Sequence, residues 1–244
     1  MTRRDRAPSF RPEGPGAIVP LCIAMSMAGG CAPTETGNPP LTPTVDVATV
    51  RHEFTGVRGD SVTFRGAPGT VTPTGGVIDA INLSQGEAAQ GTVSDDGSFS
   101  VEVLGTVADV FRLQVVSADG RRSEPLDVGV ASGAVAAIAH AIGECLALAP
   151  GDQLALPAGG AATATIALTN DCPASLSLGI PVLVLAGGGW AITPAGSLEL
   201  PAGETWSVGV ERLADAPMRD VLFVPIAAPD ADYRAVTLFV GSTE

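Results

Sequence analysis

The chain has 244 residues, a length that allows one large domain or two ordinary domains of about 100 residues each. With 45% hydrophobic and 16% charged residues a packed core is feasible, and the content of Gly and Pro stays below that of low-complexity disordered chains. A formal net charge of −13 argues against nucleic-acid binding, which needs a clustered basic surface. Lys is missing, whereas Thr, Val, Gly and Pro are abundant, and this composition favours strands and turns.

The first 30 residues have the order of a secretory signal peptide. Four arginines precede an apolar run at residues 17–28, and small residues follow it. The run is too short to span a bilayer, which takes roughly 20 residues as a helix. We therefore expect export and no permanent transmembrane helix at this end of the chain.

The residues Met27-Ala28-Gly29-Gly30-Cys31 resemble a bacterial lipobox, although Ala28 stands where Leu is commonest. The resemblance implies that Cys31 becomes the new N-terminus and carries acyl chains such as palmitate, and two or more chains anchor a protein stably. The Pro- and Thr-rich stretch that follows looks like the tether of myxobacterial-type lipoproteins. In lipoproteins an Asp directly after the lipidated cysteine favours retention in the inner membrane. Ala32 stands at that position here, so the resemblance implies the outer-membrane class. The alternative is an ordinary signal peptide with a cysteine close to its cleavage site.

Cysteine usage agrees with export. Cys22 leaves with the signal peptide and Cys31 is the expected lipidation site, so Cys145 and Cys172 remain in the mature chain. In an oxidising compartment a remaining pair most simply forms one disulfide. The alternative is two separate buried thiols.

The first expected module shows alternation with a period of two. Apolar and polar residues alternate at residues 98–103, 111–115 and 126–130, and each run predicts a strand with one buried and one wet face. Turn signals separate short strands at roughly ten-residue spacing, which is typical of a β-sandwich. The segments VIDAINL (77–83) and DGSFS (96–100) resemble immunoglobulin-like and carboxypeptidase-regulatory-like modules, and the resemblance implies a spacer, adhesion or accessory role.

An alanine-rich connector follows at residues 131–144. Its run from residue 134 to residue 142 fits a short helix after Ser132, and it fits an irregular or extended connector equally well.

The second expected module repeats the alternation with other residues. Apolar positions alternate with Thr, Ser or Gly at residues 162–169 and 206–210. The segments ATIALTN (164–170), LELPAGET (198–205) and AVTLFVG (235–241) resemble immunoglobulin-like domains of abnormal-spindle and hydin proteins. These are strand ends and turns, so no binding residue carries over from the resemblance.

The sequence offers few groups for catalysis. His52 and His140 are the two histidines, and His140 is expected to be a partly exposed polar residue and not a ligand. The block Gly59-Asp60-Ser61-Val62 resembles the nucleophile block of a lipase and esterase family, but neither histidine follows an aspartate at that family's spacing. Ser61 is better interpreted as the entry to a strand.

Loop carboxylates are the remaining candidates for chemistry. Asp95, Asp96, Asp230 and Asp232 lie in predicted loops, where oxygen ligands could gather around Ca²⁺. A cleft for sugar hydrolysis would need aromatic platforms, and the two Trp residues and the one Tyr are expected to serve packing.

These observations predict an all-β protein: two immunoglobulin-like β-sandwich domains after a signal peptide and a flexible tether. The expected segments are a signal peptide at 1–30, a tether at 31–44, a first module at 45–130, a linker at 131–144 and a second module at 145–244.

The preferred function is an exported lipoprotein, held by its lipid anchor at the outer membrane of the cell envelope. Its role would be structural, binding or adhesive, towards a protein or polysaccharide partner and without catalysis. No catalytic residue, metal site or cofactor is predicted. The alternatives are a carbohydrate-active hydrolase or accessory protein that uses loop carboxylates, and a calcium-dependent adhesin.

Overall fold

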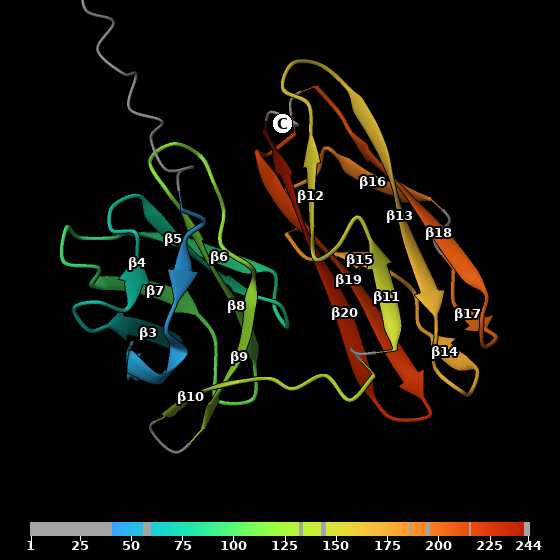
Figure 1. The fold of residues 1–244 in the computed structure, drawn as a ribbon, viewed down its shortest axis with the longest axis horizontal. Helices are drawn as coiled ribbons and strands as arrows, with labels where there is room; N and C mark the ends of the chain where they lie inside the picture. Colours follow the sequence, from blue (N-terminus) through green and yellow to red (C-terminus); the bar gives the residue numbers. More distant parts are fainter. Residues whose placement is uncertain are drawn as a thin grey trace, which may run out of the picture. The chain divides into compact units, whose positions relative to one another are not determined.

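The computed structural model describes residues 41–241 except 56–59, 132–133, 143–144, 186, 194–195 and 215 (Figure 1). The expected signal peptide, the lipidation site Cys31 and most of the tether lie outside the described residues, as does Gly59. The described residues form strands and one short 3-10 helix, η1 (Val47–Thr49). The expected all-β class is confirmed.

The first half of the described chain forms a β-sandwich, coloured blue to green in Figure 1. One layer is a three-stranded sheet in the order β2-β3-β7, and the other is a five-stranded sheet in the order β10-β9-β8-β5-β6. A small pair, β1-β4, completes it. The bounds are β1 Thr44–Val45, β2 Val50–Thr55, β3 Ser61–Gly66, β4 Val71–Thr72, β5 Val77–Asn82, β6 Glu87–Thr92, β7 Phe99–Leu104, β8 Val110–Val116, β9 Leu126–Ala131 and β10 Ala134–Ala137.

The core of this sandwich follows from the alternation in the sequence. The inward residues of β3, β5, β7 and β8 are fully or almost fully buried and form one apolar cluster. At its centre the rings of Phe64 and Phe111 meet edge to face, with their centroids 5.2 Å apart. The two sheets are thus held together by residues that the period of two places on one face.

The second half forms another sandwich, coloured yellow to red in Figure 1. A four-stranded sheet, β11-β13-β18-β16, faces a six-stranded sheet in the order β12-β20-β19-β14-β17, with β15 paired to β19. Strand β12 runs parallel to β20. The bounds are β11 Leu146–Ala149, β12 Gln153–Leu156, β13 Ala162–Asn170, β14 Leu176–Leu178, β15 Val182–Leu183, β16 Trp190–Thr193, β17 Leu198–Leu200, β18 Thr205–Arg212, β19 Arg219–Ala228 and β20 Asp232–Val240.

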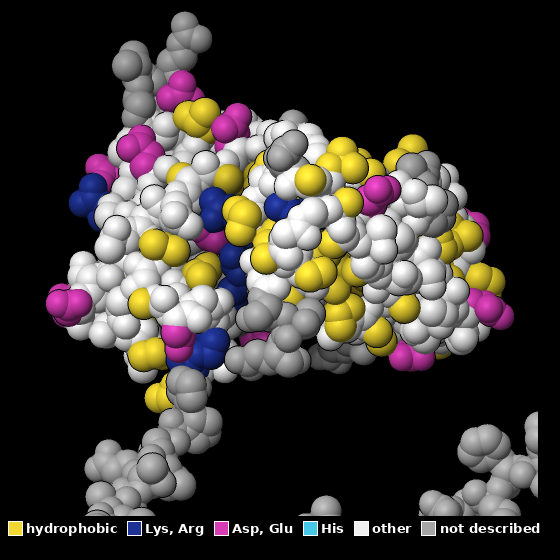
Figure 2. Space-filling model, turned by 90° about the horizontal axis from the view of Figure 1, so that it is seen from above, with side chains coloured by type: hydrophobic (Ala, Val, Ile, Leu, Met, Phe, Trp, Pro, Cys, Tyr) yellow, Lys and Arg dark blue, Asp and Glu magenta, His cyan; other side chains and the backbone are white. Residues whose placement is uncertain are grey.

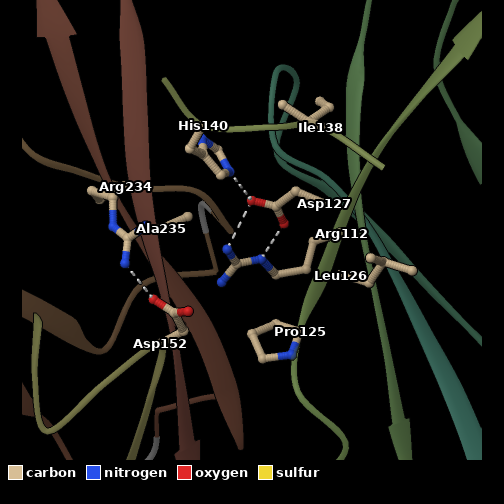
Figure 3. A pocket seen from close by; sticks show the side chains of 9 residues that line it. All are labelled: Arg112, Pro125, Leu126, Asp127, Ile138, His140, Asp152, Arg234 and Ala235. Atoms are coloured by element: carbon tan, nitrogen blue, oxygen red, sulfur yellow. Dashed lines mark hydrogen bonds and ion pairs between the residues drawn. The ribbon is translucent and has the colours of Figure 1, made fainter. Parts of the chain in front are cut away.

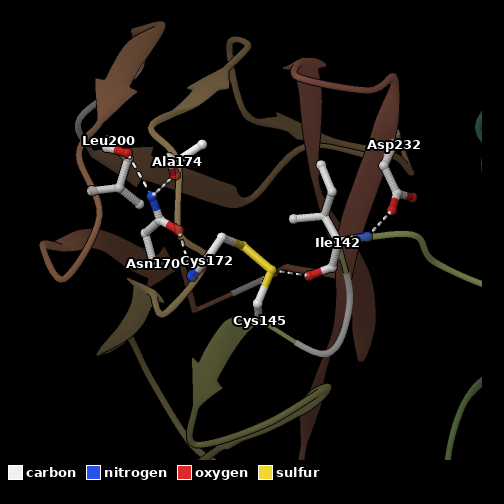
Figure 4. Close-up of a disulfide and its surroundings, with 7 residues drawn as sticks. All are labelled: Ile142, Cys145, Asn170, Cys172, Ala174, Leu200 and Asp232. Atoms are coloured by element: carbon white, nitrogen blue, oxygen red, sulfur yellow. Dashed lines mark hydrogen bonds between the residues drawn. A yellow bond between two sulfur atoms is a disulfide. The ribbon is translucent and has the colours of Figure 1, made fainter.

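A disulfide joins Cys145 to Cys172 across a sequence separation of 27 residues, as expected from the cysteine count (Figure 4). The fully buried Asn170 organises the turn beside it: its Oδ1 accepts from the Cys172 amide, and its Nδ2 donates to the carbonyls of Ala174 and Leu200. The disulfide therefore joins the start of β11 to the end of β13 at the edge of the core.

The connector and the aromatic residues have definite places. Ala134–Ala137 forms strand β10, paired antiparallel with β9, so the extended form is present there and a helix is not. Trp190 is buried in the core of the second sandwich and Trp206 packs against it, as expected for packing residues.

One expectation about the first sandwich is wrong. The five-stranded sheet was expected to have a wet face, yet Arg112 and Gln114 on β8 and Asp127 on β9 are 4%, 2% and 7% exposed. The reason is that this outer face is covered by the six-stranded sheet of the second sandwich, where residues of β5, β19 and β20 share an apolar cluster. The four main sheets are therefore stacked in the order three-, five-, six- and four-stranded.

The disulfide should contribute measurably to the unfolding free energy. Closing a loop of this length lowers the entropy of the unfolded chain, so the double variant Cys145→Ala/Cys172→Ala should lose about 3–4 kcal/mol of unfolding free energy. Denaturant unfolding of the oxidised protein and the variant measures this loss. Reductant should destabilise the wild type and leave the double variant unchanged; equal midpoints for oxidised and reduced wild type would contradict the prediction.

Candidate functional site

The candidate site lies where the two sandwiches meet. Strand geometry turns Phe111 and Leu113 of β8 into the first core, and it turns Arg112 and Gln114 to the opposite face. The covering sheet presents residues such as Thr237, which is 1% exposed. Figure 2 shows Arg side chains gathered along the boundary between the sandwiches.

An apolar cluster covers part of this interface. Ile81 and Leu83 of the first sandwich pack with Val184, Val221 and Ala235 of the second. Burial of such side chains favours docking by about 25 cal/mol per Å² removed from water. The remainder of the interface is polar and forms two networks.

The first polar network centres on Asp79 of β5, which is 1% exposed. Its carboxylate accepts from Gln90 at 2.9 Å and is paired with Arg122 at 3.5 Å and with Arg219 of β19. The Arg122 guanidinium also lies over the ring of Phe239, 4.4 Å from its centroid. Asp79 therefore binds cations from both sandwiches.

The second polar network centres on Arg112 and Asp127, which are cross-strand partners on β8 and β9. The guanidinium donates to both carboxylate oxygens, Nε to Oδ1 at 2.6 Å and a terminal nitrogen to Oδ2 at 2.9 Å. Its other terminal nitrogen donates to the Thr237 hydroxyl at 3.2 Å, across the boundary. A buried, bidentate pair of this kind needs both partners, because either charge alone would be uncompensated.

A cavity of about 140 Å³ opens beside this pair (Figure 3). Charged side chains from both sandwiches line it, among them Arg112, Asp127 and His140 on one side and Asp152 and Arg234 on the other. Asp152 and Arg234 are paired with each other at 3.1 Å. The charges that line the cavity are thus largely paired with each other.

His140 joins carboxylates from the two sandwiches. Its Nδ1 lies 2.8 Å from Oδ1 of Asp232, and its Nε2 lies 3.6 Å from Oδ2 of Asp127. The ring of Tyr233 packs edge-on against the imidazole at 4.6 Å between centroids. The other oxygen of Asp232 accepts from the Ile142 amide at 3.0 Å, so this carboxylate also fixes the connector.

These contacts shift the pKa values of the groups involved. The carboxylate of Asp127 is the largest cause that raises the pKa of His140; burial opposes the rise and Asp232 adds to it. Burial alone would raise the pKa of Asp127, but His140 and Arg112 outweigh it and hold the pKa at about 2. Burial, followed by the charge of Asp127, raises the pKa of Tyr233 far above its ordinary value.

The residues singled out in the sequence are only partly brought together. His140 and Asp232 meet, and the His140 side chain is partly exposed at 19%. Asp96 instead accepts from the Ser98 amide in the turn before β7, and Ser61 lies in β3 next to Leu104 of β7. In the part of the chain that the structure describes, no three His, Cys, Asp or Glu side chains are grouped to hold a metal ion.

Sequence reasoning missed the residues that build the interface, namely Asp79, Arg112, Gln114, Arg122, Asp127 and Arg219. Their signal was present in part: charged residues stand inside strongly apolar strands, on the face opposite the core. That pattern fits a face exposed to water and a face covered by another sheet equally well. The covering residue is far away in the sequence, since Thr237, which contacts Arg112, lies more than 100 residues further along the chain.

Comparisons with known proteins add little to this description. No family model matches the sequence, and no curated protein matches it. Among solved structures, a Caenorhabditis elegans MSP family member, WR4, is 14% identical with a TM-score of 0.34 and covers 40% of this chain and 98% of its own. A PapD-like domain of human CEP192 is 10% identical with a TM-score of 0.30 and covers 47% of this chain and 98% of its own.

A protein of unknown function from Porphyromonas gingivalis W83 has a TM-score of 0.29 at 10% identity, and covers 81% of this chain and 99% of its own. Each of these TM-scores is below 0.5, so the fold is assigned here from the strand pairing of the chain itself.

Because the two sandwiches approach closely at Gly86, a larger side chain there should destabilise the protein. A Cβ there would lie 2.3 Å from the carbonyl oxygen of Val184 in the other sandwich, and φ is +77°. Gly120 is a matched control, because its φ is +86° and a Cβ would meet no atom within 4 Å. Gly86→Ala should lower the unfolding free energy by about 1 kcal/mol or more beyond Gly120→Ala. Equal losses in denaturant unfolding would show that the sandwiches do not approach at this point.

The buried pair predicts a large cost for Arg112→Ala. Removing the guanidinium leaves Asp127 buried without its bidentate partner, which costs about 3–5 kcal/mol. Arg65→Ala is the control, since its pair with Glu53 has side chains that are 61% and 62% exposed and should contribute less than about 1 kcal/mol. Denaturant unfolding compares them, and similar losses for both variants would contradict the buried pair.

Proposed function

We propose that this protein is an exported lipoprotein, anchored in a membrane of the cell envelope through acylated Cys31, with a structural or binding role. The proposed anchor rests on the sequence: cationic residues, a short apolar run and the lipobox that ends at Cys31. Among the residues described structurally, no helix has the length and apolar character needed to cross a bilayer.

The proposed structural role is supported by the docking of the two sandwiches through a buried, charge-paired interface. Two β-sandwiches joined by a connector alone would move independently, whereas docking fixes one orientation. A docked pair presents its outer loops and strand edges in a constant arrangement, and such loops are where sandwich proteins bind partners. The tether at residues 31–44 would place this unit at a distance from the membrane.

The geometry favours this role over hydrolysis. A general acid needs a carboxyl group whose pKa is raised, and Asp127 in the cavity has a pKa of about 2. Asp152, the other carboxylate that lines the cavity, is paired with Arg234. The nine lining side chains include no Ser, Thr or Cys, which are the usual nucleophiles of ester and peptide hydrolysis. The proposed role is therefore binding or support without bond making.

Metabolic labelling tests the anchor. In a bacterial host that processes lipoproteins, an alkyne analogue of palmitate should label the wild-type protein and bring it into the membrane fraction. Cys31→Ser should abolish the label and release the protein, because no thiol remains at the lipobox. The measurement is in-gel detection of the label together with fractionation.

Cys22→Ser is the matched control, since Cys22 lies within the apolar run and leaves with the signal peptide. It should label like the wild type. Labelling of Cys31→Ser at the wild-type level, or wild-type protein that stays unlabelled and in the soluble fraction, would overturn the proposed anchor.

A further inference from the structure

We propose that His140 is a pH-sensitive latch between the two sandwiches: as imidazolium it holds Asp127 and Asp232 together, and its deprotonation weakens their docking. The latch is the contact of His140 with these two carboxylates. Asp127 belongs to β9 of the first sandwich and Asp232 begins β20 of the second. The imidazole therefore stands between one acid from each docked body.

The geometry favours a second ring proton. A neutral imidazole has one N–H, which it can donate to only one of the two acids, and its other nitrogen then presents a lone pair. Both ring nitrogens face carboxylate oxygens, at 2.8 Å and 3.6 Å. With a neutral ring, one of these contacts becomes a lone pair against an anion; with imidazolium, both are attractive.

The charges around the ring lead to the same conclusion. The groups that face His140 or line the same cavity are Asp127, Asp232, Arg112, Arg234 and Asp152, and Tyr233 packs against the ring. With Tyr233 neutral, these two cations and three anions sum to −1, and protonation of His140 brings the sum to zero. Neutralising a partly buried charge cluster that spans an interface stabilises the docked state.

The direction of the pH effect follows from linkage. Because the folded protein raises the pKa of His140, its stabilising contribution is complete below the unfolded value of about 6.5 and is lost as pH rises through the folded value. The folded protein lowers the pKa of Asp127 and Asp232, so their contribution is complete above about pH 4 and is lost in stronger acid. Docking is therefore strongest from about pH 4 to about pH 6.5, and it weakens as the pH rises through the folded pKa of His140.

The test compares the purified full chain at pH 6 and pH 9. Proton NMR follows the ring C2 protons of the two histidines through the titration, and His140→Gln identifies the His140 signal, which should titrate above pH 6.5. Thermal unfolding and small-angle X-ray scattering follow the docking. From pH 6 to pH 9 the wild type should lose about 2–4 °C more in its unfolding midpoint than His140→Gln, and its radius of gyration should increase.

His52→Gln is the matched control, because His52 lies in β2 of the outer three-stranded sheet and packs on Phe54. It should retain the pH response of the wild type. An equal response in the wild type and His140→Gln would overturn the latch. If His140→Gln fails to fold, a wild type whose radius of gyration is the same at pH 6 and pH 9 would overturn it as well.

Discussion

The arrangement of this protein depends on one buried contact between sheets. The outer face of the five-stranded sheet is covered by the six-stranded sheet, and Arg112 is held there by Asp127 on its own sheet and by Thr237 on the other. A guanidinium in such a place is tolerable only when it is paired with an acid and each of its nitrogen atoms has an acceptor, as is the case here. Few relative orientations of the two sheets are consequently allowed, since a small displacement of one sheet along the other would separate Arg112 from Thr237 and Asp79 from Arg219.

The apolar and polar parts of the interface contribute differently. The cluster around Ile81 and Val221 supplies non-directional attraction, which would tolerate several orientations. The charge pairs contribute little net energy once desolvation is counted, but they select one orientation because misplaced partners are costly. His140 adds a group that changes its charge close to neutral pH, so the same interface can respond to its surroundings.

Sequence patterns predicted the strands, the sandwich class and the cysteine pair because each depends on local periodicity or on counting. The alternation around Phe111 and Leu113 identified the core face without any partner being known. The fate of the opposite face could not be predicted, because a period of two separates the faces of a strand without saying what covers them. His140 likewise meets Asp232 across 92 residues, a distance in sequence at which no local motif operates.

A docked pair of sandwiches must tumble as one body. Backbone ¹⁵N NMR relaxation measures it directly, because rotational correlation times can be obtained separately for strands of the first and of the second sandwich. At pH 6 we expect one common correlation time, that of a unit containing both sandwiches. Two different and shorter times, each that of a single sandwich, would contradict it.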